Sequence, residues 1–99
     1  MKVHKMDHFV LTVEDSERAC EFYSGVLGMK VLSFGEGRKA LSFGEYKINL
    51  HEAVKEFTPN ALMPTPGSID VCLLTETPLD NVIQHLIDHG VPVIEGPVL

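Results

Sequence analysis

A faint internal repeat is the feature that most constrains this chain. The segment from His8 to Gly28 aligns without gaps on the segment from Asp70 to Gly90, at a constant offset of 62 residues between positions 8 and 70. Each copy reads as a strand, a helix, a glycine and a β-branched run. Self-similarity at a fixed offset indicates that one supersecondary unit is used twice. We therefore expect an α+β fold with two related halves.

The first copy predicts a complete βαβββ unit. Strands are expected at residues 3–13, ending in the run 8–13, and at residues 29–34, 39–43 and 46–52. An apolar stripe at i, i+3, i+4 and i+7 predicts a helix between the first two strands, with Asp15 or Ser16 as its N-cap. Period-two alternation sorts the first strand into two faces. One face holds Phe9, Leu11 and Val13, and the other holds His8, Val10 and Thr12.

The second copy is predicted only in part, as a βαβ unit. It comprises a strand over residues 69–75, a helix with Thr77 as its N-cap, and the start of a strand over residues 91–94. The proline-rich residues 55–67 read as a linker. We expect one domain over residues 1–99, with a complete module at 1–54 and a partial one at 68–99. The repeat maps His51 onto position 113, so we expect the missing strands to come from another chain or from residues after Leu99.

Composition narrows the classes of function. Eight basic residues stand against fourteen acidic ones, a net charge of −6, and the basic residues are scattered without a stripe that would bind phosphates. Nucleic acid is therefore not expected as a partner. A bilayer span needs about 20 consecutive apolar residues, and no apolar run approaches that length. A secretory signal is not expected at the N-terminus. Cys20 and Cys72 form no CxxC pair and are expected to be buried, reduced thiols of a cytoplasmic protein.

A family resemblance rests on the first predicted helix and on the residues that follow it. The run Phe22-Tyr23-Ser24-Gly25-Val26-Leu27-Gly28, after a polar cap and before a β-branched run, resembles the opening of the glyoxalase I/bleomycin resistance/extradiol dioxygenase superfamily, also called vicinal oxygen chelate. Residues 47–52 resemble the fourth strand of its glyoxalase-domain members. The resemblance implies two βαβββ units curved into an incomplete barrel around a cavity. The resemblance also implies a metal site, because in many members the two units bind one divalent metal ion. That ion holds two oxygens of the substrate and stabilises an enediolate.

Three residues are candidate metal ligands under this resemblance. His8 stands where the family commonly places a ligand, Asp70 is its repeat equivalent, and His51 lies on the cavity face of the fourth strand. Two histidines and a carboxylate with open positions suit Zn, Ni, Mn or Fe, and the sequence does not choose among them. The alternative to a metal-ligand role is that both histidines are ordinary hydrogen-bonded residues of their strands. Asp70 would then be hydrogen-bonded to its local backbone. Glu52 should face the helix side unless a bulge shifts the register.

The remaining cavity positions follow from the same alternation. The residues expected to line the cavity are Val10, Thr12, Asn49, Cys72 and Leu74. His85 and His89 stand four residues apart on the polar face of the second helix. Without an HExxH context they read as a solvated pair.

Three functions compete at this point. The first is a metal-dependent enzyme of the lyase or isomerase type, similar to lactoylglutathione lyase, acting on a small vicinal-oxygen substrate. Cationic residues that would bind the carboxylates of glutathione are not obvious in the sequence. The second is a metal-free drug-binding or toxin-binding protein of the bleomycin-resistance type, and the third is an inactive fragment. A homodimer is expected, because an unpaired sheet edge templates a neighbouring chain.

Overall fold

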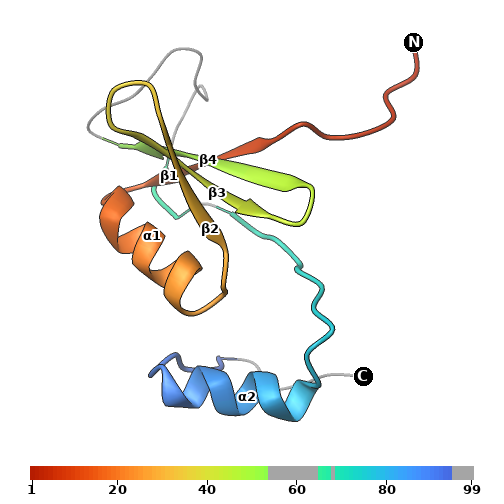
Figure 1. The fold of residues 1–99 in the computed structure, drawn as a ribbon, viewed down its shortest axis with the longest axis vertical. Coiled ribbons are helices and arrows are strands. Elements are labelled where there is room, and N and C mark those ends of the chain that lie inside the picture. Colours follow the sequence, from red (N-terminus) through yellow and green to blue (C-terminus); the bar gives the residue numbers. More distant parts are fainter. Residues whose placement is uncertain (54–64, 68, 95–99) are drawn as a thin grey trace.

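The computed structural model describes residues 1–53, 65–67 and 69–94. It contains one sheet and two helices (Figure 1), which confirms the α+β class and the βαβββ order of the first unit. The elements are β1 Phe9–Val13, α1 Ser16–Gly25, β2 Lys30–Phe34, β3 Arg38–Phe43, β4 Tyr46–Glu52 and α2 Leu79–Asp88. The bounds of β4 agree with the prediction at both ends. Most of the predicted linker at 55–67 lies outside the described residues.

The strands lie side by side in the order β1-β4-β3-β2. β1 and β4 run parallel, and the other two pairs are antiparallel. In the parallel pair Val10 lies beside Asn49 and Thr12 beside His51, so these side chains share one face of the sheet. The same register places Leu11 beside Leu50 on the other face. The two faces predicted by alternation are therefore those of the structure.

Helix α1 packs on one face of the sheet and closes the hydrophobic core (Figure 1). The buried core side chains are Leu11, Val13, Met29, Leu41, Ile48 and Leu50, and Ala19, Cys20 and Tyr23 of α1 pack against them. Leu41 and Ile48 are 0% and 1% exposed. Full burial of such a side chain contributes about 1.5–3 kcal/mol to stability, so this α1 face carries most of the hydrophobic stabilisation.

Two polar contacts fix the start of α1. The Asp15 carboxylate accepts hydrogen bonds from the backbone N–H groups of Glu17 and Arg18, which makes Asp15 the N-cap. The Ser16 hydroxyl donates to the Glu52 carboxylate at 2.6 Å and ties the helix to the end of β4. Glu52 therefore faces α1, as the period-two count predicts without a bulge.

The second unit departs from the prediction at its strands. Helix α2 forms, but residues 69–75 and 91–94 pair with no strand among the described residues. The expectation of a fifth and a sixth strand is therefore wrong for this arrangement. Alternating apolar residues make a segment suitable for a sheet, but a strand exists only when a neighbour supplies the ladder. Thr77 is also not the N-cap of α2, because the cap is Pro78, without a side-chain hydrogen bond.

The two cysteines differ in their surroundings. Cys20 is half-buried against the core, and burial raises the pKa of its thiol above the ordinary value. Cys72 is exposed, contrary to the expectation that both thiols are buried. No helix in the described part of the chain is long and apolar enough to cross a membrane.

Replacing Leu41 by alanine should lower the free energy of unfolding by about 2–5 kcal/mol, because a fully buried leucine leaves a cavity in the core. Urea denaturation followed by circular dichroism measures this change. Leu27→Ala is the matched control, since Leu27 is 39% exposed and its truncation should change the stability by less than about 1 kcal/mol. Equal losses in the two variants would contradict the core described here.

Candidate functional site

The face of the sheet opposite α1 is polar at its centre. Its strand positions are Val10, Thr12, Lys30, Leu32, Phe34, Arg38, Ala40, Ser42, Lys47, Asn49 and His51. Asn49 and His51 are only 9% and 4% exposed, yet they are among the most polar side chains there. The Asn49 Oδ1 is buried and has no hydrogen-bond partner within the described ranges. Leaving such an acceptor unsatisfied costs about 1–3 kcal/mol, so this position calls for an explanation.

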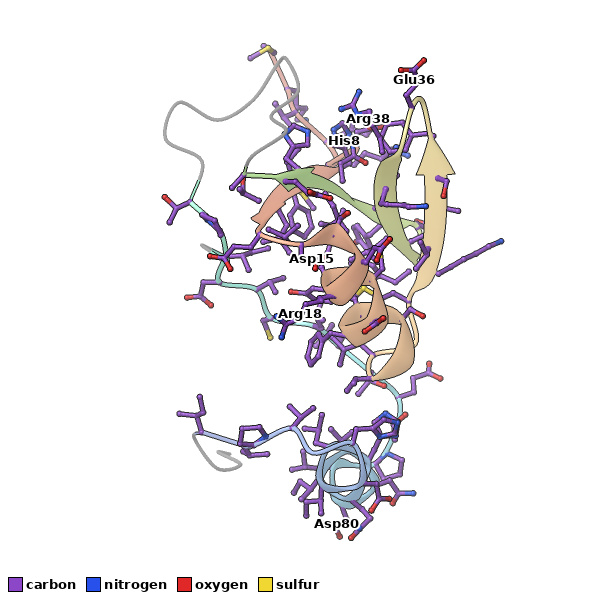
Figure 2. All side chains as sticks on the ribbon, turned by 90° about the vertical axis from the view of Figure 1, so that its left-hand side faces the viewer. His8, Asp15, Arg18, Glu36, Arg38 and Asp80 are labelled. Carbon is purple, nitrogen blue, oxygen red and sulfur yellow. The ribbon has the colours of Figure 1, made fainter. Side chains whose placement is uncertain are left out.

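His8 lies one residue before β1, and its side chain is exposed, at 37%. Its Nδ1 is 2.7 Å from the Asp7 carboxylate, and this hydrogen bond and the imidazole charge lower the pKa of Asp7. When Nδ1 carries the proton, Nε2 is the nitrogen that a neutral imidazole could offer to a metal. Continuing the β1–β4 register places His8 beside Lys47. Figure 2 shows His8 and Arg38 on the side of β4 away from α1.

The structure does not bring the three candidate metal ligands together. His51 lies opposite Thr12, four residues further along the sheet than His8. At about 3.3 Å per residue, the two histidines are separated by about 13 Å along the strands. Asp70 is exposed in the unpaired segment 69–75. Within residues 1–53, 65–67 and 69–94 no three His, Cys, Asp or Glu side chains form a group that could hold a metal ion. The described residues therefore do not by themselves fit a three-ligand metal centre.

The residues predicted to line one cavity fall into two places. Val10, Thr12 and Asn49 lie on the face opposite α1. Cys72 and Leu74 instead line a groove of about 1100 Å³ between α2 with its preceding segment and the first unit. Phe9, Phe43 and Leu86 are among the apolar side chains of this groove.

One hydrogen bond that connects α2 to the first unit was not predicted from the sequence. The His85 Nε2–H donates to the carbonyl oxygen of Val26, which follows α1, at 2.6 Å. The His89 ring lies beside that of His85, tilted by 40° with ring centroids 4.2 Å apart, and its Nδ1–H donates to the His85 carbonyl oxygen at 2.8 Å. The pair is exposed, as expected, but it also anchors the helix. Histidine spacing alone cannot reveal a partner 59 residues away.

A second missed feature is a convergence of cations on the face opposite α1. The guanidinium carbon of Arg38 lies 4.9 Å from the Phe34 ring centroid, and the Lys47 Nζ lies 5.9 Å from the same centroid. These residues come from β3, β2 and β4. Alternation could assign Lys47 to this face, but its approach to the same ring as Arg38 depends on how the strands pair.

Known proteins are similar to this chain in both sequence and fold. A 46% identical virulence protein, STM3117 of Salmonella typhimurium, has a crystal structure that matches with a TM-score of 0.94, over 99% of this chain and 78% of that one. An integron cassette protein, VCH_CASS1 of V. cholerae, is 50% identical with a TM-score of 0.93, over 99% of this chain and 77% of that one.

The curated relatives are longer than this chain. The glyoxalase domain-containing protein RDO1 of Mycosarcoma maydis is 48% identical over 99% of this chain, which spans 55% of the RDO1 length. The chain spans 68% of the length of STM3117. The family model described as Glyoxalase/Bleomycin resistance protein/Dioxygenase superfamily matches residues 5–98. The resemblance inferred from the helix is thereby confirmed, and the chain belongs to the glyoxalase/bleomycin resistance protein/dioxygenase superfamily.

Proposed function

We propose that this chain is a small-molecule-binding module of its superfamily, with the ligand held on the face of the sheet opposite α1. The observation that carries the proposal is the buried Asn49 Oδ1, which has no partner among the described residues. Native proteins rarely retain such an atom without a use. A ligand that donates a hydrogen bond there would satisfy it. The residue would then lower the stability of the free protein in return for binding.

The composition of the two faces also supports a ligand site on the face opposite α1. The α1 face is filled by apolar side chains and closed by the helix, so it offers no polar group for recognition at its centre. The face opposite α1 combines apolar surface from Leu32 and Phe34 with polar groups from Asn49 and His51. Ligand sites typically join a mostly apolar lining with a few placed polar groups.

A metal-dependent lyase of the lactoylglutathione-lyase type is the second candidate. It is favoured by the register, which places His51 of β4 on the face opposite α1 and, when continued to the residue before β1, places His8 on the same face. The Asp7 contact to His8 also resembles the outer-shell carboxylates that orient metal-binding imidazoles. Because the two histidines are spaced too widely to share an ion, this activity would require ligands from beyond the described residues. The binding module is therefore the proposal that we retain.

We also infer that the chain forms a homodimer. The groove beside α2 is lined largely by apolar side chains, and Leu74 and Ile94 are each 96% exposed. Exposed apolar surface of this kind marks an interaction site or an aggregation risk. A second copy that covers Leu74 would remove this surface from water.

Replacing Asn49 by leucine, which has a similar volume, should leave the free energy of unfolding unchanged or raise it by about 1 kcal/mol, because the substitution removes a buried acceptor that has no partner. Chemical denaturation of the ligand-free protein measures the change. Asn81→Leu is the control, since Asn81 is exposed on α2. A loss of more than about 1 kcal/mol in Asn49→Leu alone would show that Asn49 is structural and would contradict the proposal.

Calorimetric titration with ZnCl₂ and NiCl₂ separates the two candidate functions. The binding-module proposal predicts no stoichiometric site that depends on both histidines, because His8 and His51 are about 13 Å apart along the strands. Tight 1:1 binding that is lost in both His8→Ala and His51→Ala would reject this view and favour the metal-dependent enzyme. His4→Ala, at an exposed position outside the strands, is the control.

Sedimentation velocity tests the homodimer. The 11.0 kDa chain should sediment as a species of about 22 kDa at micromolar concentrations. Leu74→Glu should shift it to the monomer, because a carboxylate would be buried at the interface. Val3→Glu, at an 80% exposed position near the N-terminus, should not. A monomer at all concentrations for the unsubstituted chain would refute the inference.

A further inference from the structure

The side chains of Lys47 and Phe34 bridge the face opposite α1 diagonally. Lys47 lies on β4 opposite Ser42, and Phe34 lies on β2 opposite Arg38. Two strand spacings and the steps along β3 from Ser42 to Arg38 separate their Cα atoms, a distance of about 16 Å at about 4.8 Å per strand and 3.3 Å per residue. The Lys47 Nζ nevertheless lies 5.9 Å from the Phe34 ring centroid. Each side chain must therefore extend across the face toward the other.

The middle of this Lys47–Phe34 bridge lies over Ala40 and beside Asn49. Ala40 pairs with Asn49 on β4 and with Leu32 on β2, so it occupies the sheet position halfway along the diagonal. Its single methyl group leaves a depression that longer side chains can lie across. Ala40 is 1% exposed and Asn49 is 9% exposed, although α1 packs on the other face. The bridge therefore crosses the face where its burial is deepest.

The bridge has the properties of a contact that can open. Lys47 and Phe34 are both half-buried, and neither belongs to the hydrophobic core that α1 closes. The attraction between a partly exposed ammonium and an aromatic ring is weak. A lysine ammonium is also strongly hydrated and sits on a flexible stem, so water is a good alternative environment for it. Opening the bridge would therefore leave the fold intact.

We infer that the Lys47–Phe34 bridge is an autoinhibitory contact, which closes the proposed ligand site in the free protein and opens when a ligand displaces Lys47. The Asn49 Oδ1 is buried and has no partner among the described residues, so a ligand donor reaches it only after a side chain above it moves. Because the free protein must open first, the apparent affinity falls in proportion to the fraction of open molecules. This regulation rests on the proposed function.

NMR titration of the ¹³C,¹⁵N-labelled protein with lactamide tests the inference. Lactamide carries a hydroxyl donor and no charge, so a change of charge at position 47 does not alter its attraction to the face. In the free protein we expect nuclear Overhauser contacts between the ε-protons of Lys47 and the ring protons of Phe34. Lactamide should shift the side-chain amide signals of Asn49 and, in the same titration, abolish these contacts.

Substitutions then measure the effect of the bridge on affinity. Lys47→Ala should bind lactamide about two- to fivefold more tightly, the factor that corresponds to one partly exposed cation–π contact. Lys47→Met retains the stem without the ammonium, and its affinity should fall between those of Lys47→Ala and the unsubstituted protein. Lys30→Ala is the matched control, because it removes the same charge from an exposed position on the same face, opposite Ser42. It should leave the affinity unchanged.

Two results would reject the regulation and leave the proposed function standing. One is a shift of the Asn49 signals while the contacts between Lys47 and Phe34 persist, and the other is equal tightening in Lys30→Ala and Lys47→Ala. Binding seen only in Lys47→Ala would support the inference, since the unsubstituted site would then be closed. If lactamide binds neither Lys47→Ala nor the unsubstituted protein, the inference fails, and the stability of Asn49→Leu still tests the proposed function separately.

Discussion

The parallel pairing of β1 with β4 is the constraint on which the rest of the structure depends. It joins the first and last strands of the βαβββ unit, places β1 at one edge of the sheet and requires α1 to cross one face. Because neighbours in this pair share a face, the register decides at once which residues enter the core and which do not. A slip of one residue would move Leu50 out of the core and bring Asn49 into it.

The register also separates the apolar face that α1 covers from the face on which we propose that a ligand binds. The α1 face is apolar, and the contact between Ser16 and Glu52 anchors the helix at its edge. The opposite face retains the buried Asn49 Oδ1, which has no hydrogen-bond partner among the described residues. A buried acceptor of this kind lowers the stability of a free protein, and the ligand that we propose for this face would satisfy it.

Much of this fold can be predicted from the sequence, because its signals are local. The alternation in residues 46–52 predicts both ends of β4 and the orientation of Glu52, and Asp15 is a recognisable N-cap. The failures are of another kind. Residues 69–75 alternate like a strand, but pairing needs a neighbour that the alternation does not encode.

The candidate site shows the same limit. His8, His51 and Asp70 were grouped by repeat position and family resemblance, but the register separates the two histidines, and Asp70 lies in the unpaired segment. The approach of both Arg38 and Lys47 to the Phe34 ring was not apparent in the sequence, since it depends on the order of three strands. The sequence therefore predicts which side chains share a face of the sheet, but it does not predict the distances between side chains of different strands.

A crystal structure of the protein grown with lactate, a small probe with a hydroxyl donor, would test the central claim most directly, because it places the probe relative to both faces of the sheet. We expect density for lactate on the face opposite α1, with its hydroxyl group directed at the Asn49 Oδ1. Density for lactate only in the groove beside α2, with no ligand on the face opposite α1, would contradict it.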